Sequence, residues 1–414
     1  MTQGFFASRW VPRPEHVAED PDGGLPRGFR AGAIAAGLRP DGRIDLALLV
    51  CDAPEAVSAA RFTRSGVLAA PVLLCKERAQ LQALRVIVAN SGNANAATGR
   101  RGLDEAARVQ GAAAMACGVE ADRVAIASTG VIGVQLDGGA IVTALAKLRS
   151  GLHRAGDEEL ATAIMTTDAF AKRAELTVQL SSGSVRLTAQ AKGAGMIEPA
   201  FATMLCFVQT DAALEPETAE LLLGVCVKRS FDRISVDGQL STNDTVILMC
   251  SGASGVRVAP ESPDELLFGE ALDALLRMLA LMIVRDGEGA RRIGRVVVRG
   301  GEQDVVERAA RAVANSPLVK TALHGADPNW GRIAQAIGAA LPYTAPLALD
   351  IAIEGIRVCA AGAAVAYDAA ALDAAAAGDE VEYEVGLPGE GAETEVFFSD
   401  LGHEYVTINA DYTT

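Results

Sequence analysis

The sequence predicts a mixed α/β or α+β protein of layered helices and sheets, with a second domain or subdomain near its C-terminal end. Short apolar runs typical of strands alternate with segments of helical periodicity along the 414-residue chain. Half of the residues are apolar but only 4% are aromatic, so small aliphatic side chains must fill a core between closely spaced layers. The pattern restarts near residue 292 with GRVVVRGG, which indicates the second domain.

The first part of the chain supplies short apolar runs separated by turn-rich pieces. Three of these runs are predicted strands: DLALLVCD, VLAAPVLLC and LRVIVAN. A helical pattern begins at Leu103 and closes on Gly118, a predicted C-cap. RVAIASTGVIG then predicts a strand that enters a tight loop, and DEELATAIMTTD predicts a helix that ends near Thr166 and Thr167.

The middle and end of the chain continue the alternation. ELTVQLSSGSVRLTAQAKG alternates apolar and polar residues around SSGS, which predicts a hairpin. TMLCFVQTDA predicts a strand buried on both faces, because its apolar run is continuous. Helices are expected around residues 216–231 and 261–284, and in the Ala-rich run 360–377. The C-terminal stretch from EVEYEVG to INADYTT is expected to form strand, turn, strand and strand.

Composition and charge argue against several classes of protein. The net charge of −15 disfavours nucleic acid as a partner. The seven cysteines are scattered and never form CxxC, which is typical of reduced thiols in a cytoplasmic protein. The first residues, MTQGFFASRW, lack the pattern of a secretory signal. The apolar helix that ends in LMIV carries Glu270, Asp273 and Arg277, so we expect a core helix and no membrane span.

Familiar catalytic motifs are missing from the sequence. The four histidines are not spaced as metal ligands, and there is neither a P-loop nor a G-x-S-x-G motif. Cys206 lies in an apolar run and is expected to be an inert core thiol. SVDGQLSTNDT contains Asp237, Asn243 and Asp244, but its spacing does not match a calcium loop, so we expect a hydrogen-bonded turn there.

One hydroxyl stands out, that of Thr203 in KGAGMIEPAFATMLC. A threonine hydroxyl is a poor nucleophile unless a base lies beside it, and a free α-amine supplies one when the threonine is the first residue of a chain. That arrangement requires cleavage of the backbone between Ala202 and Thr203. ASTGVIG places Thr129 and Gly130 in a tight loop, where inward N–H groups or the Thr129 hydroxyl would stabilise an oxyanion. Taken alone, the first motif favours a structural threonine and the second an ordinary strand-to-helix turn.

Taken together, the motifs resemble the ornithine acetyltransferase (glutamate N-acetyltransferase) family of bifunctional arginine-biosynthesis enzymes. The resemblance extends in order over nearly the whole chain. The matching stretches are SGNANAATG, ASTGVIG, TTDAFAK, KGAGMIEPAFATML, SVDGQLSTNDT, VRDGEGA, LVKTALHGADPNWGR and INADYTT. It implies a layered α/β sandwich, similar to but distinct from N-terminal-nucleophile hydrolases, with a second α/β domain.

The resemblance also implies the chemistry. The precursor is expected to cleave itself into an α chain, 1–202, and a β chain, 203–414, with a structural boundary at about residue 290. Thr203 accepts the acetyl group of N-acetylornithine and passes it to glutamate, without a metal or an organic cofactor; whether acetyl-CoA also serves as donor stays open. An α2β2 assembly is implied. The family's oxyanion pair falls on Thr129 and Gly130, and its substrate contacts fall on Thr166, Lys192, Thr203, Glu288, Asn409 and Thr414.

Two of these contacts are charged, and each suits one group of an amino acid. Lys192 is a suitable partner for a carboxylate and Glu288 for an ammonium group. Asn409 and Thr414 belong to the C-terminal tail, which therefore has to return to the site.

The sequence departs from the family pattern at several positions near the motifs. Asn-Met before ATML becomes Ala200-Phe201, the stretch before Lys172 becomes Ala169-Phe170-Ala171, and Asp-Thr becomes Gln239-Leu240. These changes leave open a relative with another acyl group or acceptor. An N-terminal-nucleophile amidase or aminopeptidase that delivers the acyl group to water is the main alternative, and an uncleaved binding protein is a second.

Overall fold

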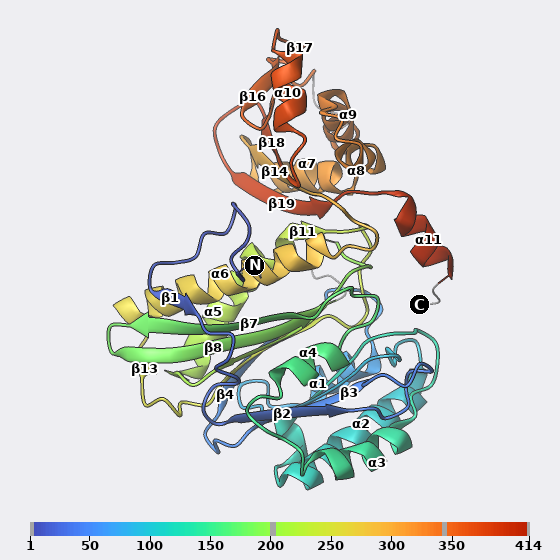
Figure 1. Ribbon diagram of the computed structural model, residues 1–414, viewed down its shortest axis with the longest axis vertical. Coiled ribbons are helices and arrows are strands. Elements are labelled where there is room, and N and C mark those ends of the chain that lie inside the picture. Colours follow the sequence, from blue (N-terminus) through green and yellow to red (C-terminus); the bar gives the residue numbers. More distant parts are fainter. Residues whose placement is uncertain (1–3, 199–203, 342–345, 412–414) are drawn as a thin grey trace.

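The computed structural model describes residues 4–198, 204–341 and 346–411 (Figure 1). Its first sheet has the strand order β1-β7-β8-β9-β12-β4. The strands are β1 Val17–Glu19, β7 Lys172–Leu180, β8 Gly183–Lys192, β9 Leu205–Thr210, β12 Thr245–Cys250 and β4 Val57–Phe62. β9 and β12 are parallel and the other neighbours are antiparallel.

A second sheet, in the order β2-β3-β5-β6, lies against the first. Its strands are β2 Phe29–Ile34, β3 Leu46–Cys51, β5 Val86–Asn90 and β6 Val124–Ser128. The two sheets share one buried cluster, in which Phe207 and Ile247 of the first sheet join Leu49 and Ile87 of the second. This face-to-face contact is the centre of a sandwich.

Helices cover both outer faces of this sandwich (Figure 1). α5, Pro216–Arg229, and α6, Pro263–Arg285, bury Leu223 and Leu275 against the first sheet. The second sheet is covered by α1, Ala70–Arg78, α2, Gly99–Cys117, and α3, Gly138–Leu148. The fold class predicted from the sequence, a layered α/β sandwich, is confirmed.

A third sheet, in the order β11-β19-β14-β18-β15-β16-β17, occupies the top of Figure 1. Its strands are β11 Ile234–Ser235, β19 Glu393–Ser399, β14 Ile293–Arg299, β18 Glu380–Gly386, β15 Asp350–Ile353, β16 Ile356–Ala360 and β17 Ala363–Ala364. With it lie α7 Gln303–Asn315, α8 Pro317–His324, α9 Trp330–Ala340 and α10 Ala369–Ala375. These elements form their own apolar cluster, although β11 comes from the sandwich part of the chain.

The remaining elements connect these parts. Two short strands, β10 Ala213–Leu214 and β13 Arg257–Val258, pair in parallel. α4, Asp157–Ala163, contacts strands of both sandwich sheets, and α11, His403–Asp411, follows β19. Short 3-10 turns lie at Ala121–Arg123 and Phe231–Arg233. Among the described residues, no helix combines the length and apolar character that crossing a membrane requires.

Several predicted elements are confirmed. The hairpin pairs Leu180 with Gly183 across the two-residue turn Ser181-Ser182. All six residues of β9 are buried, as expected for a strand with apolar neighbours on both faces. α2 ends with Gly118 in the left-handed conformation, φ 67°, and therefore has the predicted glycine C-cap.

Other elements differ from the prediction. VLAAPVLLC is not a strand but the beginning of α1, because Pro71 lies in the first helical turn, where a missing N–H costs nothing. The strand that the sequence predicts at the end of the chain is wrong, because residues 403–411 form α11. Only Ala369–Ala375 of the Ala-rich run is helical, beginning after the cap Asp368.

Candidate active site

A cavity of about 110 Å³ opens where loops of the two sandwich sheets meet the C-terminal helix. Thr129, Gly130, Thr166, Lys192 and Asn409, five of the predicted site residues, belong to its wall. The other lining residues are Ala94, Ile132, Thr167, Gly195, Met196, Gln239, Ser241, Thr242 and Asn243. Ala202, Thr203 and Thr414 lie outside the described residues.

The loop after β6 holds Thr129 and Gly130 against the loop after β5. Thr129 N donates to Asn90 O at 2.9 Å, so this N–H is already used, and the hydroxyl is the group that Thr129 offers to the cavity. Gly130 has φ 131°, and a Cβ there would lie 2.4 Å from the Gly92 carbonyl carbon. Only glycine fits this position.

Asn243 of the SVDGQLSTNDT stretch links three loops around the cavity. Its Nδ2 donates to Ala94 O at 2.6 Å and to Ser128 O at 2.9 Å. In the same stretch, the Asp237 carboxylate accepts from Met196 N at 2.6 Å and Ile197 N at 2.8 Å. Within the stretch, Asp237 Oδ1 accepts from Gln239 N at 3.2 Å and Ser241 Oγ accepts from Asn243 N at 3.1 Å, so the predicted hydrogen-bonded turn is confirmed. Among the residues that the structure describes, no group of three or more His, Cys, Asp or Glu is arranged to hold a metal.

Lys192, the last residue of β8, carries a buried ammonium group on the cavity wall. Its Nζ donates to Thr129 Oγ1 at 3.2 Å. Burial lowers the pKa of Lys192, and the Asp168 carboxylate opposes this shift. The side chain therefore offers a poorly solvated positive charge to a ligand, which favours a charged acceptor group.

A buried ion cluster beside the cavity was not predicted from the sequence. Lys172 Nζ donates to Asp168 Oδ1 at 2.7 Å and to Asp286 Oδ2 at 2.5 Å. Asp168 also accepts from the backbone N–H of Gly193 at 2.7 Å and of Thr166 at 3.0 Å. Despite its burial, the ammonium groups of Lys192 and Lys172 hold the pKa of Asp168 well below its usual range.

This cluster fixes two segments of the cavity wall through their backbones, at Thr166 and next to Lys192. Its members stand in TTDAFAK and VRDGEGA, two motifs used for the family resemblance. The sequence feature that could have indicated this cluster is the presence of acidic residues inside otherwise apolar or glycine-rich stretches. The chain order could not indicate that Asp168 and Asp286, far apart in sequence, share one ammonium group.

Glu288 is not among the lining residues but lies directly behind the wall. Its N–H donates to Ala194 O at 2.9 Å, and its Oε2 accepts from Asn409 Nδ2 at 2.6 Å. A Cβ on Gly195 would lie 2.7 Å from the Glu288 carboxyl carbon. Glu288 is thus close to Asn409 and Gly195, which do line the cavity.

The C-terminal helix α11 (Figure 1) returns to the site and contacts the loop that contains Glu288 through Asn409. Gly289 has φ 73°, and a Cβ there would lie 2.6 Å from the Glu404 Cβ of α11. Glycine permits both the backbone conformation and the close approach of the helix. Asn409 therefore reaches the cavity from the far end of the chain.

Phe170, a position where this chain departs from the family pattern, does not line this cavity. Its ring lies 4.9 Å from Lys172 Nζ, and it borders a separate cavity with Phe5 and Met278. Gln239, another departure, does belong to the wall of the active-site cavity. The departure at residue 239 is therefore better placed to contact a ligand than the departure at Phe170.

The family model named ArgJ family matches residues 30–414. The chain belongs to the ArgJ family. Among curated ArgJ relatives, the arginine biosynthesis bifunctional protein ArgJ of Geobacter sulfurreducens is 42% identical over 94% of this chain and 99% of its own. That of Nitratidesulfovibrio vulgaris is 42% identical over 94% of this chain and 98% of its own. The predicted family is confirmed.

Two solved structures match parts of the chain. The arginine biosynthesis bifunctional protein argJ of Bacillus halodurans is 35% identical, covering 50% of this chain and 98% of the matched chain, with a TM-score of 0.47. The ornithine acetyltransferase of Mycobacterium tuberculosis, solved in complex with ornithine, is 33% identical and covers 45% of this chain and 99% of its own, with a TM-score of 0.41.

Proposed function

We propose that this chain is a self-processing acetyltransferase of arginine biosynthesis. It cleaves itself between Ala202 and Thr203, and the new N-terminal threonine carries an acetyl group from N-acetylornithine to glutamate. The observation that carries this proposal is one cavity wall that combines Thr129, Gly130, Thr166, Lys192 and Asn409 in a member of the ArgJ family. The curated ArgJ relatives are arginine biosynthesis bifunctional proteins.

The acetyl transfer proceeds in two half-reactions. The α-amine of Thr203 takes the hydroxyl proton while the oxygen attacks the acetyl carbonyl carbon, and ornithine leaves as the tetrahedral intermediate collapses. Glutamate then attacks the acetyl-threonine and regenerates the hydroxyl. The Thr129 hydroxyl and the Gly130 backbone stabilise the oxyanion in both steps. No metal or organic cofactor takes part.

Two charges orient the amino-acid substrates. Lys192 pairs with the substrate carboxylate, because its ammonium group is buried on the wall and, among the described residues, donates a single 3.2 Å bond, to Thr129. Glu288 attracts the substrate ammonium group from behind Gly195, and Asn409 holds the Glu288 carboxylate in place at 2.6 Å. Thr166 and Thr414 complete the proposed contacts.

Acetyl-CoA is proposed as a further donor, which would give amino-acid N-acetyltransferase activity on glutamate without N-acetylornithine. The curated relatives are described as bifunctional, and the acetyl-threonine intermediate is the same whichever donor supplies it. We further propose a cytoplasmic enzyme in which chains 1–202 and 203–414 form an α2β2 assembly, with a domain boundary at about residue 290.

Intact-mass measurement tests the processing. The purified protein should contain two chains that end and begin at Ala202–Thr203, and Thr203→Ala should contain only the uncleaved chain of 42.8 kDa. A single uncleaved chain in the wild-type protein would contradict the proposal. Thr203→Ala is the matched control, since it removes the nucleophile alone.

An activity assay separates transfer from hydrolysis. With N-acetylornithine, acetylglutamate should form only when glutamate is present, and ornithine release should rise with the glutamate concentration. Release of ornithine and acetate at the same rate without glutamate would favour the amidase alternative. Turnover of a different acyl group or acceptor in place of these substrates would favour a relative with another metabolic role.

A further inference from the structure

Asp244 is a fully buried carboxylate that none of the proposed catalytic steps uses. It directly precedes β12, whose first residue lies opposite Leu205 in the register of β9. Its Oδ1 accepts from Met204 N at 3.1 Å. Met204 directly follows the predicted nucleophile in the chain, so the carboxylate is held by the residue next to it in sequence.

The other carboxylate oxygen, Oδ2, is shielded from solvent and has no hydrogen-bond donor among the described residues. The neighbouring Asn243 uses its Nδ2 in two hydrogen bonds to backbone oxygens. Leaving a buried acceptor unpaired is costly, so such an atom calls for an explanation. A proton-transfer role explains it.

The surroundings of Asp244 suit a base. Burial raises the pKa of Asp244 well above its usual range. The Met204 N–H, the hydroxyls of Ser241 and Thr63, and the Lys192 ammonium group on β8 favour the charged form but do not outweigh burial. A carboxylate of raised proton affinity accepts a proton from a hydroxyl more readily than an exposed one does.

We propose that Asp244 is the proton relay of the self-cleavage, an inference that rests on the processing proposed above. Asp244 Oδ2 takes the Thr203 hydroxyl proton while Thr203 Oγ bonds to the Ala202 carbonyl carbon. Asp244 then returns this proton to the Thr203 nitrogen as the C–N bond breaks. The resulting ester joins Ala202 to Thr203 Oγ, and water hydrolyses it to a carboxylate on Ala202 and a free hydroxyl on Thr203.

The test is the rate at which full-length precursor disappears after expression, followed by intact mass. Asp244→Asn keeps an oxygen for the Met204 N–H but cannot relay a proton, so its cleavage should be slower by about 100-fold or more. Asp244→Glu, which keeps a carboxylate, should cleave measurably faster than Asp244→Asn. Cleavage of wild type and Asp244→Glu should also accelerate as the pH rises through the pKa of the carboxyl group.

Asp211→Asn is the matched control. Asp211 is also buried, follows the far end of β9, and accepts from Arg186 N at 2.8 Å; this variant should cleave at the wild-type rate. If wild type is cleaved and Asp244→Asn is cleaved equally fast, the relay is wrong while the self-processing function stands. If Asp244→Asn does not fold, Asp244→Glu decides. Cleavage of Asp244→Glu at the wild-type rate and with no dependence on pH would overturn the relay. If the wild-type protein itself stays uncleaved, the proposed self-processing function is wrong.

Discussion

At the scale of single residues, the side chains of the site act as pre-positioned charges and hydrogen-bond donors. Lys192 is the clearest example, because its charge is buried. Its ammonium group is withdrawn from water, contacts Thr129 at 3.2 Å and lies within the field of Asp168. Such a group gains most when a ligand brings a carboxylate to it, because a charge-assisted hydrogen bond contributes about 1.5–3 kcal/mol.

Lys192→Met should therefore raise KM for N-acetylornithine by roughly 10- to 100-fold. Methionine keeps most of the aliphatic length, and Asp168 keeps its hydrogen bonds from Lys172 and Gly193. Steady-state kinetics on the cleaved protein gives the value, and an unchanged melting temperature shows that the fold is intact. An unaltered KM would exclude the proposed contact with the substrate carboxylate.

Gln239 tests how this chain differs from its family at the cavity wall. Gln239→Asp restores the family residue and adds a negative charge to a partly solvated wall, where a charge pair contributes up to about 1 kcal/mol. KM for N-acetylornithine and KM for glutamate should then shift apart, by up to about fivefold. Gln239→Asn controls for the shorter side chain. Equal effects of both variants would show that charge at this position does not select the substrate.

At the scale of elements, the site depends on segments that are far apart in the chain and meet at glycines. α11 reaches the cavity because Gly289 leaves room for Glu404 and Tyr405. Gly130 similarly lets the loop after β6 touch the loop after β5. Both glycines combine a left-handed φ with a close neighbour, so each is needed for two reasons.

Gly289→Ala should displace α11 and remove Asn409 from the cavity. Its Cβ would overlap Glu404, so KM for both substrates should rise several-fold and amide protons of residues 403–411 should exchange faster. Gly355→Ala is a close control, since Gly355 has φ 74° but nothing within 4 Å of the added Cβ. It carries the same backbone strain. If both variants have the same kinetics, contact with α11 does not support the site.

Sequence reasoning succeeded where local patterns decide the structure. The two-residue hairpin turn, the buried strand β9 and the Gly118 cap all follow from short-range rules. The family predicted from the motifs is confirmed by the comparisons. The roles assigned to single site residues stay predictions.

The failures have physical causes of two kinds. VLAAPVLLC is apolar in a way that suits a strand or a buried helix equally, and tertiary packing under the second sheet selects the helix. α11 has no buried residue of its own, so its apolar pattern carried little signal. The Asp168–Lys172–Asp286 cluster depends on contacts between distant segments, which a one-dimensional pattern does not encode.

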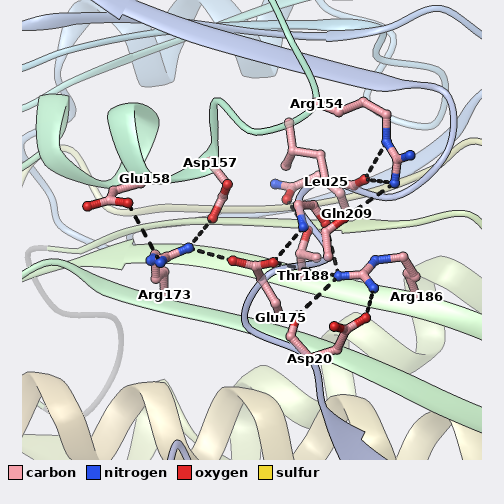
Figure 2. Close-up of polar contacts among 12 residues, drawn as sticks. Asp20, Leu25, Arg154, Asp157, Glu158, Arg173, Glu175, Arg186, Thr188 and Gln209 are labelled. Atoms are coloured by element: carbon pink, nitrogen blue, oxygen red, sulfur yellow. Dashed lines mark hydrogen bonds and ion pairs between the residues drawn. The ribbon is translucent and has the colours of Figure 1, made fainter. Parts of the chain in front are cut away.

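At the scale of the whole molecule, a second charge network ties the N-terminal segment and α4 to the first sheet (Figure 2). Arg173 Nη1 donates to Asp157 Oδ2 at 2.6 Å and to Glu175 Oε1 at 2.5 Å. Glu175 also accepts from Gly24 N at 2.7 Å, and Arg186 lies 3.6 Å from it. Residues from four parts of the chain thus share one partly buried polar network.

This network should make the stability of the protein depend on pH. Burial, followed by repulsion from Asp157, raises the pKa of Glu175 to about 7, against an ordinary value of 4.5. The folded state therefore binds more protons than the unfolded state between these values, and the free energy of unfolding should fall as the pH rises from about 4.5 to about 7. The loss should be on the order of 1–3 kcal/mol.

Glu175→Gln isolates this contribution, because glutamine keeps an oxygen for Gly24 N and carries no charge. Urea unfolding at pH 5 and pH 8 should show the variant gaining stability relative to wild type as the pH rises. Asp52→Asn is a control, since Asp52 pairs with Arg30 at the surface and its pKa is lowered by that pair. A constant difference between Glu175→Gln and wild type at both pH values would show that Glu175 titrates alike in the folded and unfolded chain.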